Sequence, residues 1–322
     1  MREVKLQITA NEADQRLDRF LRKYLSKASL GLIYKFLRKK DITVNGEKVK
    51  ENYRLKIGDI VHFNKYVRVD DLIEVEVPEY YDPEFDVVYQ DQRLFIVDKP
   101  SGLLVHANQK GSQNTLNTQV LSYFIDKEIF DPEEELTFTP APSNRLDRNT
   151  SGLVMFAKDY QTQQALNQMI KERRIDKYYL ALVKGKVEEQ VQELEGYLSK
   201  DEYNNQVKVF DEEREDSLPI HTRYRTKKVG EEFTLLEVEL ITGRSHQIRA
   251  HLASIGHPIV GDPKYGDQGI NQLVKDKWGL NNQFLHAYKL VFRDPIKPLT
   301  YLTQCQFEAK LPEKLDQIAE KI

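Results

Sequence analysis

An α+β protein of two units is predicted from the chain length, the mixed apolar patterns and the charge distribution. At 322 residues the chain exceeds the length of one typical domain. Apolar residues recur at helical spacing in some segments and in short strand-like runs in others. Residues 16–56 carry 13 Lys and Arg against 4 Asp and Glu, whereas the rest carries 35 against 47. A basic unit attached to an acidic body indicates a polyanionic partner.

The basic unit is expected to contain two helices and then a small sheet. Apolar residues at helical spacing mark the first helix: Leu17, Phe20, Leu21, Tyr24 and Leu25. Ser29 can cap the second helix, which is rich in Lys and Arg. Asn45-Gly46 predicts a hairpin after a strand at 42–44. Residues 54–57 and 60–63 are expected to form two short strands about a turn.

A linker is expected at residues 64–84, which are acidic, rich in tyrosine and contain two prolines within six residues. The body that follows mixes strand and helix patterns. Asp159 can cap a helix, and the polar segment 185–232 is expected to form hairpins or loops. The expected strands of the body are 85–89, 94–97, 153–157, 177–183 and 233–240.

Residues 144–152 read Asn-Arg-Leu-Asp-Arg-Asn-Thr-Ser-Gly and run directly into an apolar strand. Arg145 and Arg148 flank Asp147 and favour its ionised form, which can attack as a nucleophile or take a proton. Turn residues before a strand place such a group at the rim of a sheet, where sites are commonly built. A solvated surface ion pair is the alternative interpretation of the same residues.

A second polar stretch, residues 242–252, leads into a helix that Ser245 can cap. The exposed amides and the dipole at a helix N-terminus attract phosphate. The side chains expected there are Arg244, His246 and Gln247. Arg249 lies one turn further on, beside the apolar stripe, where a guanidinium needs a carboxylate partner.

No metal and no cofactor are expected. His246 and His251 are five residues apart, about 140° around a helix, whereas two ligands on one helix face are usually four apart. The single cysteine, Cys305, excludes an internal disulfide and a Cys-rich metal site. No apolar run approaches the ~20 residues of a membrane span, and residues 1–5 lack an apolar signal region. A cytoplasmic protein without a membrane partner is therefore expected.

Several of these stretches resemble the RluA-type pseudouridine synthases. They are the Arg-Leu-Asp stretch at 144–152, the Lys-Pro-x-Gly stretch at 98–106, the Lys-x-Tyr stretch at 177–179, the stretch 242–266 and the closing segment 285–292. Two residues depart from the family pattern: Asp98 replaces the usual Asn, and Asn144 stands where His is common. The resemblance implies a catalytic domain over 85–312, built on a large mixed, mostly antiparallel sheet flanked by helices and loops.

The resemblance also implies roles for three residues. Asp147 is implied to be the catalytic residue, Arg249 to pair with it and hold it ionised, and Tyr179 to stack on the substrate base. Adjacent residues of a strand face opposite sides, which supports the choice of Tyr179 over Tyr178. Ordinary half-buried packing is the alternative for Tyr179, and both a core position and an RNA contact remain open for Lys99.

The two basic helices and the Val-Asn-Gly turn resemble the alpha-L RNA-binding module first described in a small-subunit ribosomal protein. This small α/β module is assigned to residues 12–63, ahead of the linker at 64–84. Phosphate contacts supply affinity with little sequence information, although a merely solvated basic face is the alternative. The expected RNA contacts of the whole chain are Arg19, Lys35, Arg38, Lys39, Arg145, Arg148, Arg244, His246 and Gln247.

The function implied by the resemblance is the isomerisation of uridine to pseudouridine in RNA by a monomeric enzyme. A basic module ahead of this body resembles members that act on large-subunit ribosomal RNA. Three alternatives remain open at this point. They are a synthase acting on transfer RNA, a glycosidase that releases uracil with a second acid, and a non-catalytic RNA-binding or ribosome-assembly protein.

Overall fold

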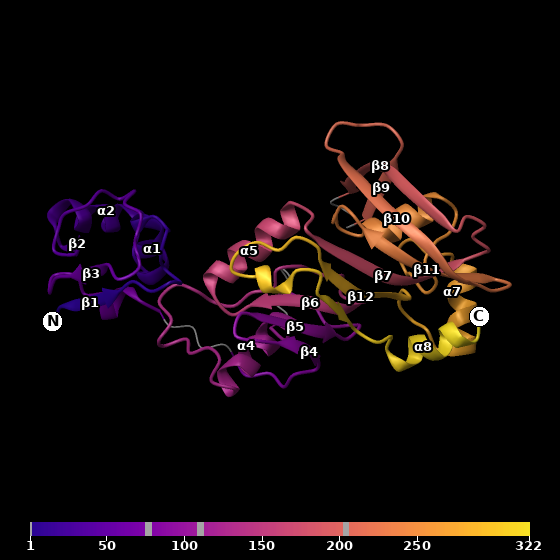
Figure 1. The fold of residues 1–322 in the computed structure, drawn as a ribbon, viewed down its shortest axis with the longest axis horizontal. Coiled ribbons are helices and arrows are strands. Elements are labelled where there is room, and N and C mark those ends of the chain that lie inside the picture. The colour runs from indigo at the N-terminus through magenta and orange to yellow at the C-terminus, as the bar shows by residue number, and fades with distance from the viewer. Residues whose placement is uncertain (1, 75–78, 108–112, 202–205) are drawn as a thin grey trace.

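The structure is a computed structural model that describes residues 2–74, 79–107, 113–201 and 206–322. Two sheets organise the chain, one of three strands near the N-terminus and one of ten strands in the rest. Figure 1 shows the small unit at one end of an elongated molecule, with helices flanking the large sheet. The predicted α+β class with a large, mostly antiparallel sheet is confirmed.

The small unit packs two helices and a short sheet around one core. Its helices are α1 (Leu17–Tyr24) and α2 (Leu30–Lys39), and its antiparallel strands, in the order β1-β3-β2, are β1 (Val4–Gln7), β3 (Ile60–Phe63) and β2 (Ile42–Val44). The apolar stripe of α1 is buried in this core, as its spacing predicts. Ser29 caps α2, because its Oγ accepts a hydrogen bond from the N–H of Leu32.

The predicted strand at 54–57 does not form. The N–H of Leu55 donates to the carbonyl of Gln15, so the backbone of this segment bonds to the loop before α1. Asp59 then closes the turn by accepting a hydrogen bond from the N–H of Lys56. Asn45-Gly46 does turn after β2, with φ values of 53° and 81°. Val44 and Glu47 pair across this turn through two backbone hydrogen bonds, as a tight hairpin requires, and β2 as a whole pairs with β3.

A short helix, α3 (Val69–Leu72), lies within the segment expected to be a linker, and Val69 is buried in the core of the small unit. Polar contacts join the small unit to the body. The side-chain amide of Asn11 donates to both oxygens of Glu135, at 3.0 and 3.1 Å. The ammonium of Lys23 lies 5.5 Å from the centre of the Tyr160 ring.

The large sheet follows the order β4-β5-β6-β12-β7-β11-β10-β8-β9, with β13 (Gln306–Glu308) paired to β12. All neighbours are antiparallel except β6 and β12, which run parallel and pair only through residues 151–152 and 286–287. This short parallel join connects the two halves of the sheet. The nine strands of the path are β4 (Asp86–Gln90), β5 (Leu94–Lys99), β6 (Ser151–Ala157), β7 (Ile175–Lys184), β8 (Val191–Asp201), β9 (Gln206–Phe210), β10 (Leu218–Val229), β11 (Phe233–Leu240) and β12 (Leu285–Phe292).

Helices cover both faces of the half formed by β4, β5 and β6. Leu153 and Met155 of β6 pack with α5 (Tyr160–Lys171), whereas Val154 and Phe156 pack with α4 (Leu116–Asp126) on the opposite face. The alternation follows from the strand geometry, and burial on both faces explains why β6 is apolar throughout. Asp159 caps α5 as predicted, since its carboxylate accepts from the N–H of Thr162.

The other half of the sheet is also covered on both faces. Tyr179, Ala181 and Val183 of β7 pack with α6 (Gln247–Ser254), whereas Leu182 packs with α7 (Gln268–Trp278) and α8 (Glu313–Glu320). Strands β8, β9 and β10 form the hairpins expected within 185–232. A 3-10 turn, Thr300–Leu302, precedes β13. In the described part of the chain, no helix has the length and apolar character needed to cross a membrane.

Candidate active site

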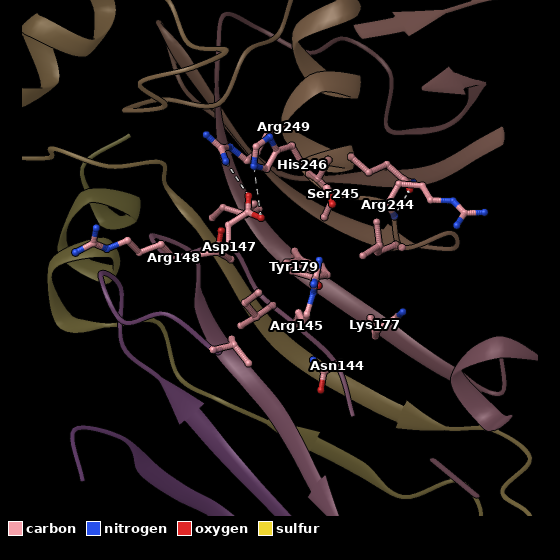
Figure 2. Close-up of a pocket in the computed structure, with 18 of the residues that line it drawn as sticks. Asn144, Arg145, Asp147, Arg148, Lys177, Tyr179, Arg244, Ser245, His246 and Arg249 are labelled. Carbon is pink, nitrogen blue, oxygen red and sulfur yellow. Dashed lines mark hydrogen bonds and ion pairs between the residues drawn. The ribbon is translucent and has the colours of Figure 1, made fainter. Parts of the chain in front are cut away.

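A cleft of about 490 Å³ opens near the parallel join of β6 and β12. Figure 2 shows the loop before β6, strand β7 and the start of α6 around it. Among the described residues that line it, Asp147 is the single carboxylate. The lining cations are Arg145, Arg148, Lys177, Arg244 and Arg249. This charge balance suits an anionic ligand such as a nucleic-acid backbone.

Asp147 and Arg249 form an ion pair in this cleft. Nη1 of Arg249 donates to Oδ2 of Asp147 over 2.7 Å (Figure 2). The side chain of Arg249 is 5% exposed, while that of Asp147 is 26% exposed. The guanidinium on the apolar side of α6 therefore has the carboxylate partner that its position requires, and Asp147 remains open to the cleft.

A second carboxylate, Asp262, completes the surroundings of Arg249. Asp262 is fully buried and accepts hydrogen bonds from Nε of Arg249 at 2.7 Å and from Nη2 at 2.8 Å. It also accepts from the backbone N–H groups of Lys264 and Tyr265. Burial alone would lower the pKa of Arg249, but the hydrogen bonds and charge of Asp262, followed by those of Asp147, raise it. Asp262 thus fixes a charged guanidinium that faces Asp147.

Contacts to β12 position the loop that carries Asp147. Oγ of Ser151 lies 2.9 Å from Nδ1 of His286, and the amide of Gln283 donates to Oγ1 of Thr150. Gly152 has a φ of +119°, and a Cβ at this position would lie 2.3 Å from the carbonyl oxygen of Ala287. The close approach of β6 to β12 therefore requires glycine at the end of this loop.

Lys99 holds the same loop from β5. Its side chain is completely buried, and Nζ donates to the carbonyls of Pro100, Leu103 and Arg148 at 2.7, 2.8 and 3.1 Å. Burial lowers the pKa of Lys99 to about 7, against the opposing charges of Asp147 and Asp98. Of the two interpretations left open for Lys99, these contacts favour the core position.

Tyr179 lies on the wall of the cleft, and its side chain is almost completely buried. Tyr178 lies on the opposite face of β7, where the ammonium of Lys289 is 4.6 Å from the centre of its ring. Burial raises the pKa of the Tyr179 hydroxyl, and the charge of Asp147 acts in the same direction. The hydroxyl therefore keeps its proton at neutral pH.

His246 enters the cleft from the residue immediately before α6. Its backbone is left-handed, with a φ of 56°. Nδ1 lies 2.9 Å from Oη of Tyr265, and Nε2 lies 4.0 Å from Oδ1 of Asp147. The prediction that Ser245 caps this helix is wrong, because the helix begins one residue later and His246 occupies the capping position without a side-chain cap.

The remaining predicted contacts in the body differ in accessibility. Arg145, Arg148 and Arg244 are exposed at the cleft. Arg148 donates to the carbonyl of Gly102 and points away from Asp147 (Figure 2). Among the ion pairs of the described residues, neither Arg145 nor Arg148 pairs with Asp147, so Arg249 provides the cation expected from the flanking arginines. Gln247 is 2% exposed, and both ends of its amide bond to protein groups.

The predicted contacts of the small unit lie on the outer surfaces of α1 and α2. They are Arg19, Lys35, Arg38 and Lys39, all exposed. Within the described part of the chain, none of the four forms an ion pair with a carboxylate, which leaves their charges available to phosphates. No cluster of three or more His, Cys, Asp or Glu suited to a metal ion occurs among the described residues.

Two family models match the sequence. Residues 93–254 match the model described as RNA pseudouridylate synthase, and residues 15–61 match the S4 domain. The chain belongs to the RNA pseudouridylate synthase family. The first match spans Asp147, Tyr179 and Arg249, and the second spans the two basic helices of the small unit. The chain is thus a pseudouridine synthase, an isomerase that acts on RNA and carries an N-terminal RNA-binding module.

Curated relatives of this synthase are similar over most of its length. The ribosomal large subunit pseudouridine synthase C of Escherichia coli K12 is 34% identical over 293 residues, which cover 89% of this chain and 88% of the relative. The protein of the same name from Haemophilus influenzae is 30% identical over 321 residues, covering 98% and 94%.

Solved structures support the fold of the body. The human RNA pseudouridylate synthase domain containing 4 superimposes with a TM-score of 0.56 at 20% identity, covering 73% of this chain and 92% of that one. The human RNA pseudouridylate synthase domain containing 1 gives a TM-score of 0.52 at 22% identity, covering 75% and 97%.

Two residues that contact the predicted site of the synthase are not among the site residues that the sequence predicts: Asp262 and Tyr265. Lys99, for which the sequence leaves a core position and an RNA contact open, supports the site from the core. The signal for Asp262 was present, because a buried guanidinium with five donors needs more than one acceptor. A Gly-Asp-Pro turn alone does not indicate which cation its carboxylate meets. Tyr265 and Lys99 act through long-range contacts that a linear pattern does not reveal.

Proposed function

We propose that this synthase converts a uridine of large-subunit ribosomal RNA to pseudouridine, with Asp147 as the reacting carboxylate. The observation that carries the proposal is the pair of Asp147 and Arg249, in which the cation is buried and the carboxylate is open to the cleft. The printed names of the relatives from Escherichia coli and Haemophilus influenzae support the large-subunit target.

The reaction is an internal exchange of bonds within one nucleotide. The bond from N1 of uracil to C1′ of ribose breaks, the base turns, and a bond from C5 to C1′ forms. The proton lost from C5 is balanced by one gained at N1, so no oxidant or group donor is needed. An ionised carboxylate beside the sugar and base is suited to this covalent chemistry. Enclosure keeps water away from the detached base.

The other residues of the cleft are proposed to hold the carboxylate and the base. Arg249 supplies the positive charge beside Asp147 and fixes one of its oxygens, because the position of Arg249 is itself set by Asp262. Tyr179 is proposed to stack its ring on the uracil. Its hydroxyl is protonated, so it can relay the proton from C5 by passing on its own proton as it accepts the new one.

RNA recognition is proposed to use both units. Flipping a uridine out of its stack costs a few kcal/mol, which backbone contacts can offset. The exposed Arg145, Arg148 and Arg244 are placed for this at the cleft, and the basic face of α1 and α2 is placed for it at the other end of the molecule (Figure 1). His246 and Gln247 were predicted for the same role. Gln247 is proposed instead to support α6, because its amide is used internally.

We further propose that the chain is divided into an RNA-binding module at 12–63, a connection at 64–84 and a catalytic domain at 85–312. We also propose that the protein acts as a monomer in the cytoplasm. The separate cores of the two units support the division. The strand β1 and the buried Val69 add flanking residues to the module core. One chain contains both an RNA-binding unit and a complete candidate site, which supports action as a single copy.

The test compares the full-length wild type with Asp147→Asn on ribosomal and transfer RNA isolated from a strain lacking the gene. We expect the wild type to form pseudouridine at defined positions of large-subunit RNA, and the variant to form none while its Kd for RNA stays within about threefold. Modification confined to transfer RNA contradicts the target, and free uracil in the supernatant indicates a glycosidase. An active Asp147→Asn variant contradicts the catalytic assignment.

A further inference from the structure

The two carboxylate oxygens of Asp147 face different partners. Oδ2 receives the hydrogen bond from Arg249 at 2.7 Å, while Oδ1 faces Nε2 of His246 at 4.0 Å (Figure 2). The side chain of His246 is only 12% exposed. His246 is predicted to contact RNA, but its ring points at the carboxylate of Asp147 within the cleft. This geometry favours a role in positioning Asp147.

The hydrogen bonds of Tyr265 favour one tautomer of His246. The N–H of Val207 donates to Oη of Tyr265 over 2.8 Å, which uses the phenol oxygen as an acceptor. The phenol proton is then available to Nδ1 of His246, 2.9 Å away. This arrangement favours Nδ1 as the acceptor, which in a neutral imidazole places the proton on Nε2. That N–H faces Asp147.

The charges around His246 favour the neutral ring. Burial lowers the pKa of His246, and the nearby Arg249 and Lys264 act in the same direction against the charges of Asp147 and Asp262. Burial also raises the pKa of Tyr265, which keeps its proton available for Nδ1. A neutral, largely buried imidazole is poorly suited to bind a phosphate as a cation.

The backbone of His246 is held in a conformation that most residues avoid. Its φ of 56° lies in the left-handed region, immediately before α6. For a residue other than glycine this costs of order 1 kcal/mol. Asn, Asp and His adopt the left-handed region more readily than other side chains with a Cβ. A change from His to Asn therefore keeps this backbone conformation while it alters the side chain.

We propose that His246 is a positioning residue, a neutral hydrogen-bond donor whose Nε2–H is aimed at Oδ1 of Asp147 and whose tautomer is fixed by Tyr265. The separation of 4.0 Å is too long for a hydrogen bond and closes when RNA fills the cleft, as catalytic contacts often do. With both oxygens held by donors, the carboxylate keeps one orientation toward the substrate. The inference rests on the proposed role of Asp147.

Two substitutions separate the loss of the Nε2–H donor of His246 from any effect of the substitution on its left-handed backbone. His246→Gln can place an amide N–H near the position of Nε2, whereas the shorter His246→Asn reaches only the position of Nδ1. Asn suits the left-handed backbone better, so the Asn variant should be at least as stable as the Gln variant. We expect kcat to fall by about thirtyfold for Asn and by no more than about fivefold for Gln, with KM within twofold in both.

Steady-state kinetics on large-subunit RNA with all three proteins provide the measurement. A wild-type kcat for His246→Asn overturns the proposal. So does a raised KM with unchanged kcat in both variants, because that pattern indicates a contact with RNA that is equal in the ground and transition states.

The tautomer is tested independently of activity by ¹⁵N NMR of the histidine rings in the full-length protein without RNA. His257 serves as an internal standard for the opposite tautomer, because its Nδ1 donates to the carbonyl of Lys184. We expect the proton of His246 on Nε2 in the wild type, and a mixture of tautomers with a three- to tenfold lower kcat in Tyr265→Phe. A proton on Nδ1 of His246 in the wild type overturns this inference, even if Asp147→Asn is inactive as proposed above. An active Asp147→Asn variant removes the proposed function and leaves the NMR result standing.

Discussion

Arg249 and Asp147, 102 positions apart in the chain, meet through a hydrogen bond of 2.7 Å between Nη1 and Oδ2. Arg249 belongs to α6, whereas Asp147 belongs to the loop before β6. The two elements come from opposite sides of the β6–β12 join, so the pair forms only when the two halves of the sheet are assembled. Assembly of the proposed reacting carboxylate is thereby coupled to folding of the whole body.

Asp262→Asn should lower both the stability and the turnover of the synthase, although Asp262 does not line the cleft. Removing one charge from a buried ion pair leaves its partner uncompensated, so we expect a loss of about 3 kcal/mol in the free energy of unfolding. Arg249 also loses its bidentate anchor, and kcat should fall at least tenfold. Urea unfolding and single-turnover kinetics measure the two effects.

Glu172→Gln is the matched control for Asp262→Asn. It removes a carboxylate from the exposed pair with Arg174, in which both side chains are about one third exposed. Its Tm and kcat should match the wild type, because surface pairs contribute little. If Asp262→Asn behaves like this control, Asp262 does not hold Arg249 in place.

The roles of the motif residues can be predicted from local sequence, whereas the contacts that hold those residues in place cannot. Asp147 stands out because a carboxylate between two arginines lies among turn residues before an apolar strand. The resemblance to the Lys-x-Tyr motif assigns Tyr179, and strand alternation supports that choice over Tyr178. The burial of Arg249 predicts carboxylate partners, and more than one of them, but it does not predict that Asp262 is the second one. Its position depends on how the loop after residue 260 returns to α6, which is a tertiary property.

Local patterns failed where backbone groups bond to distant segments. Residues 54–57 look like a strand, but the N–H of Leu55 is taken by Gln15 in a loop 40 residues earlier. Ser245 has the side chain of a helix cap, yet His246 takes the capping position with a left-handed backbone. A positive φ at a residue other than glycine is imposed by packing, so propensity does not predict it.

Tyr179→Phe and Tyr179→Leu should separate the ring from the hydroxyl. Phe keeps an aromatic face and about the same packing, whereas Leu removes the surface proposed to stack on uracil. We expect Tyr179→Phe to retain RNA binding but lose at least a hundredfold in kcat, because the protonated hydroxyl is absent. Tyr179→Leu should in addition raise KM. Near wild-type turnover by Tyr179→Phe would show that the hydroxyl takes no part.

Lys99 should give the stability of the protein a distinct pH dependence. Burial lowers the pKa of Lys99 to about 7 from an ordinary value of 10.5. Between these pH values the unfolded chain binds a proton that the folded chain does not, so the stability from this group rises with pH. The contribution is fully present above about pH 10.5 and is lost progressively as the pH falls from there to about 7. We expect the unfolding free energy of the wild type to rise, relative to Lys99→Met, by on the order of 1 kcal/mol per pH unit above pH 7.

Guanidinium titrations of the two proteins at pH 6, 7, 8 and 9 measure that difference. Lys99→Met should also be less stable at every pH, by about 1–3 kcal/mol, because it leaves buried carbonyls without a donor: three that the ammonium contacts, and two that the neutral amine can still reach above pH 7. A difference that stays constant between pH 7 and 9 would show that Lys99 keeps its proton in the folded protein.

Gly152→Ala should disrupt the join between the two halves of the sheet. The added Cβ would lie 2.3 Å from a backbone oxygen of β12, at a φ of +119° that side chains rarely adopt. We expect a loss of about 3 kcal/mol or more in stability, with loss of activity. Gly31→Ala is the control, because a Cβ there meets no atom within 4 Å on the exposed side of α2. It should gain about 0.5–1 kcal/mol.

Neutralising the basic face of α2 should weaken RNA binding without slowing the chemistry. In the triple variant Lys35→Gln, Arg38→Gln and Lys39→Gln, each lost phosphate contact should reduce the slope of log K against log salt by about 0.7–0.9. The kcat at saturating RNA should stay unchanged, because the cleft lies in the body. The matched control neutralises Lys275, Lys310 and Lys321, three exposed lysines on and beside α7 and α8, at the opposite end of the molecule (Figure 1). An equal change of slope in both triple variants would mean that the effect follows net charge, and it would remove the module from RNA recognition.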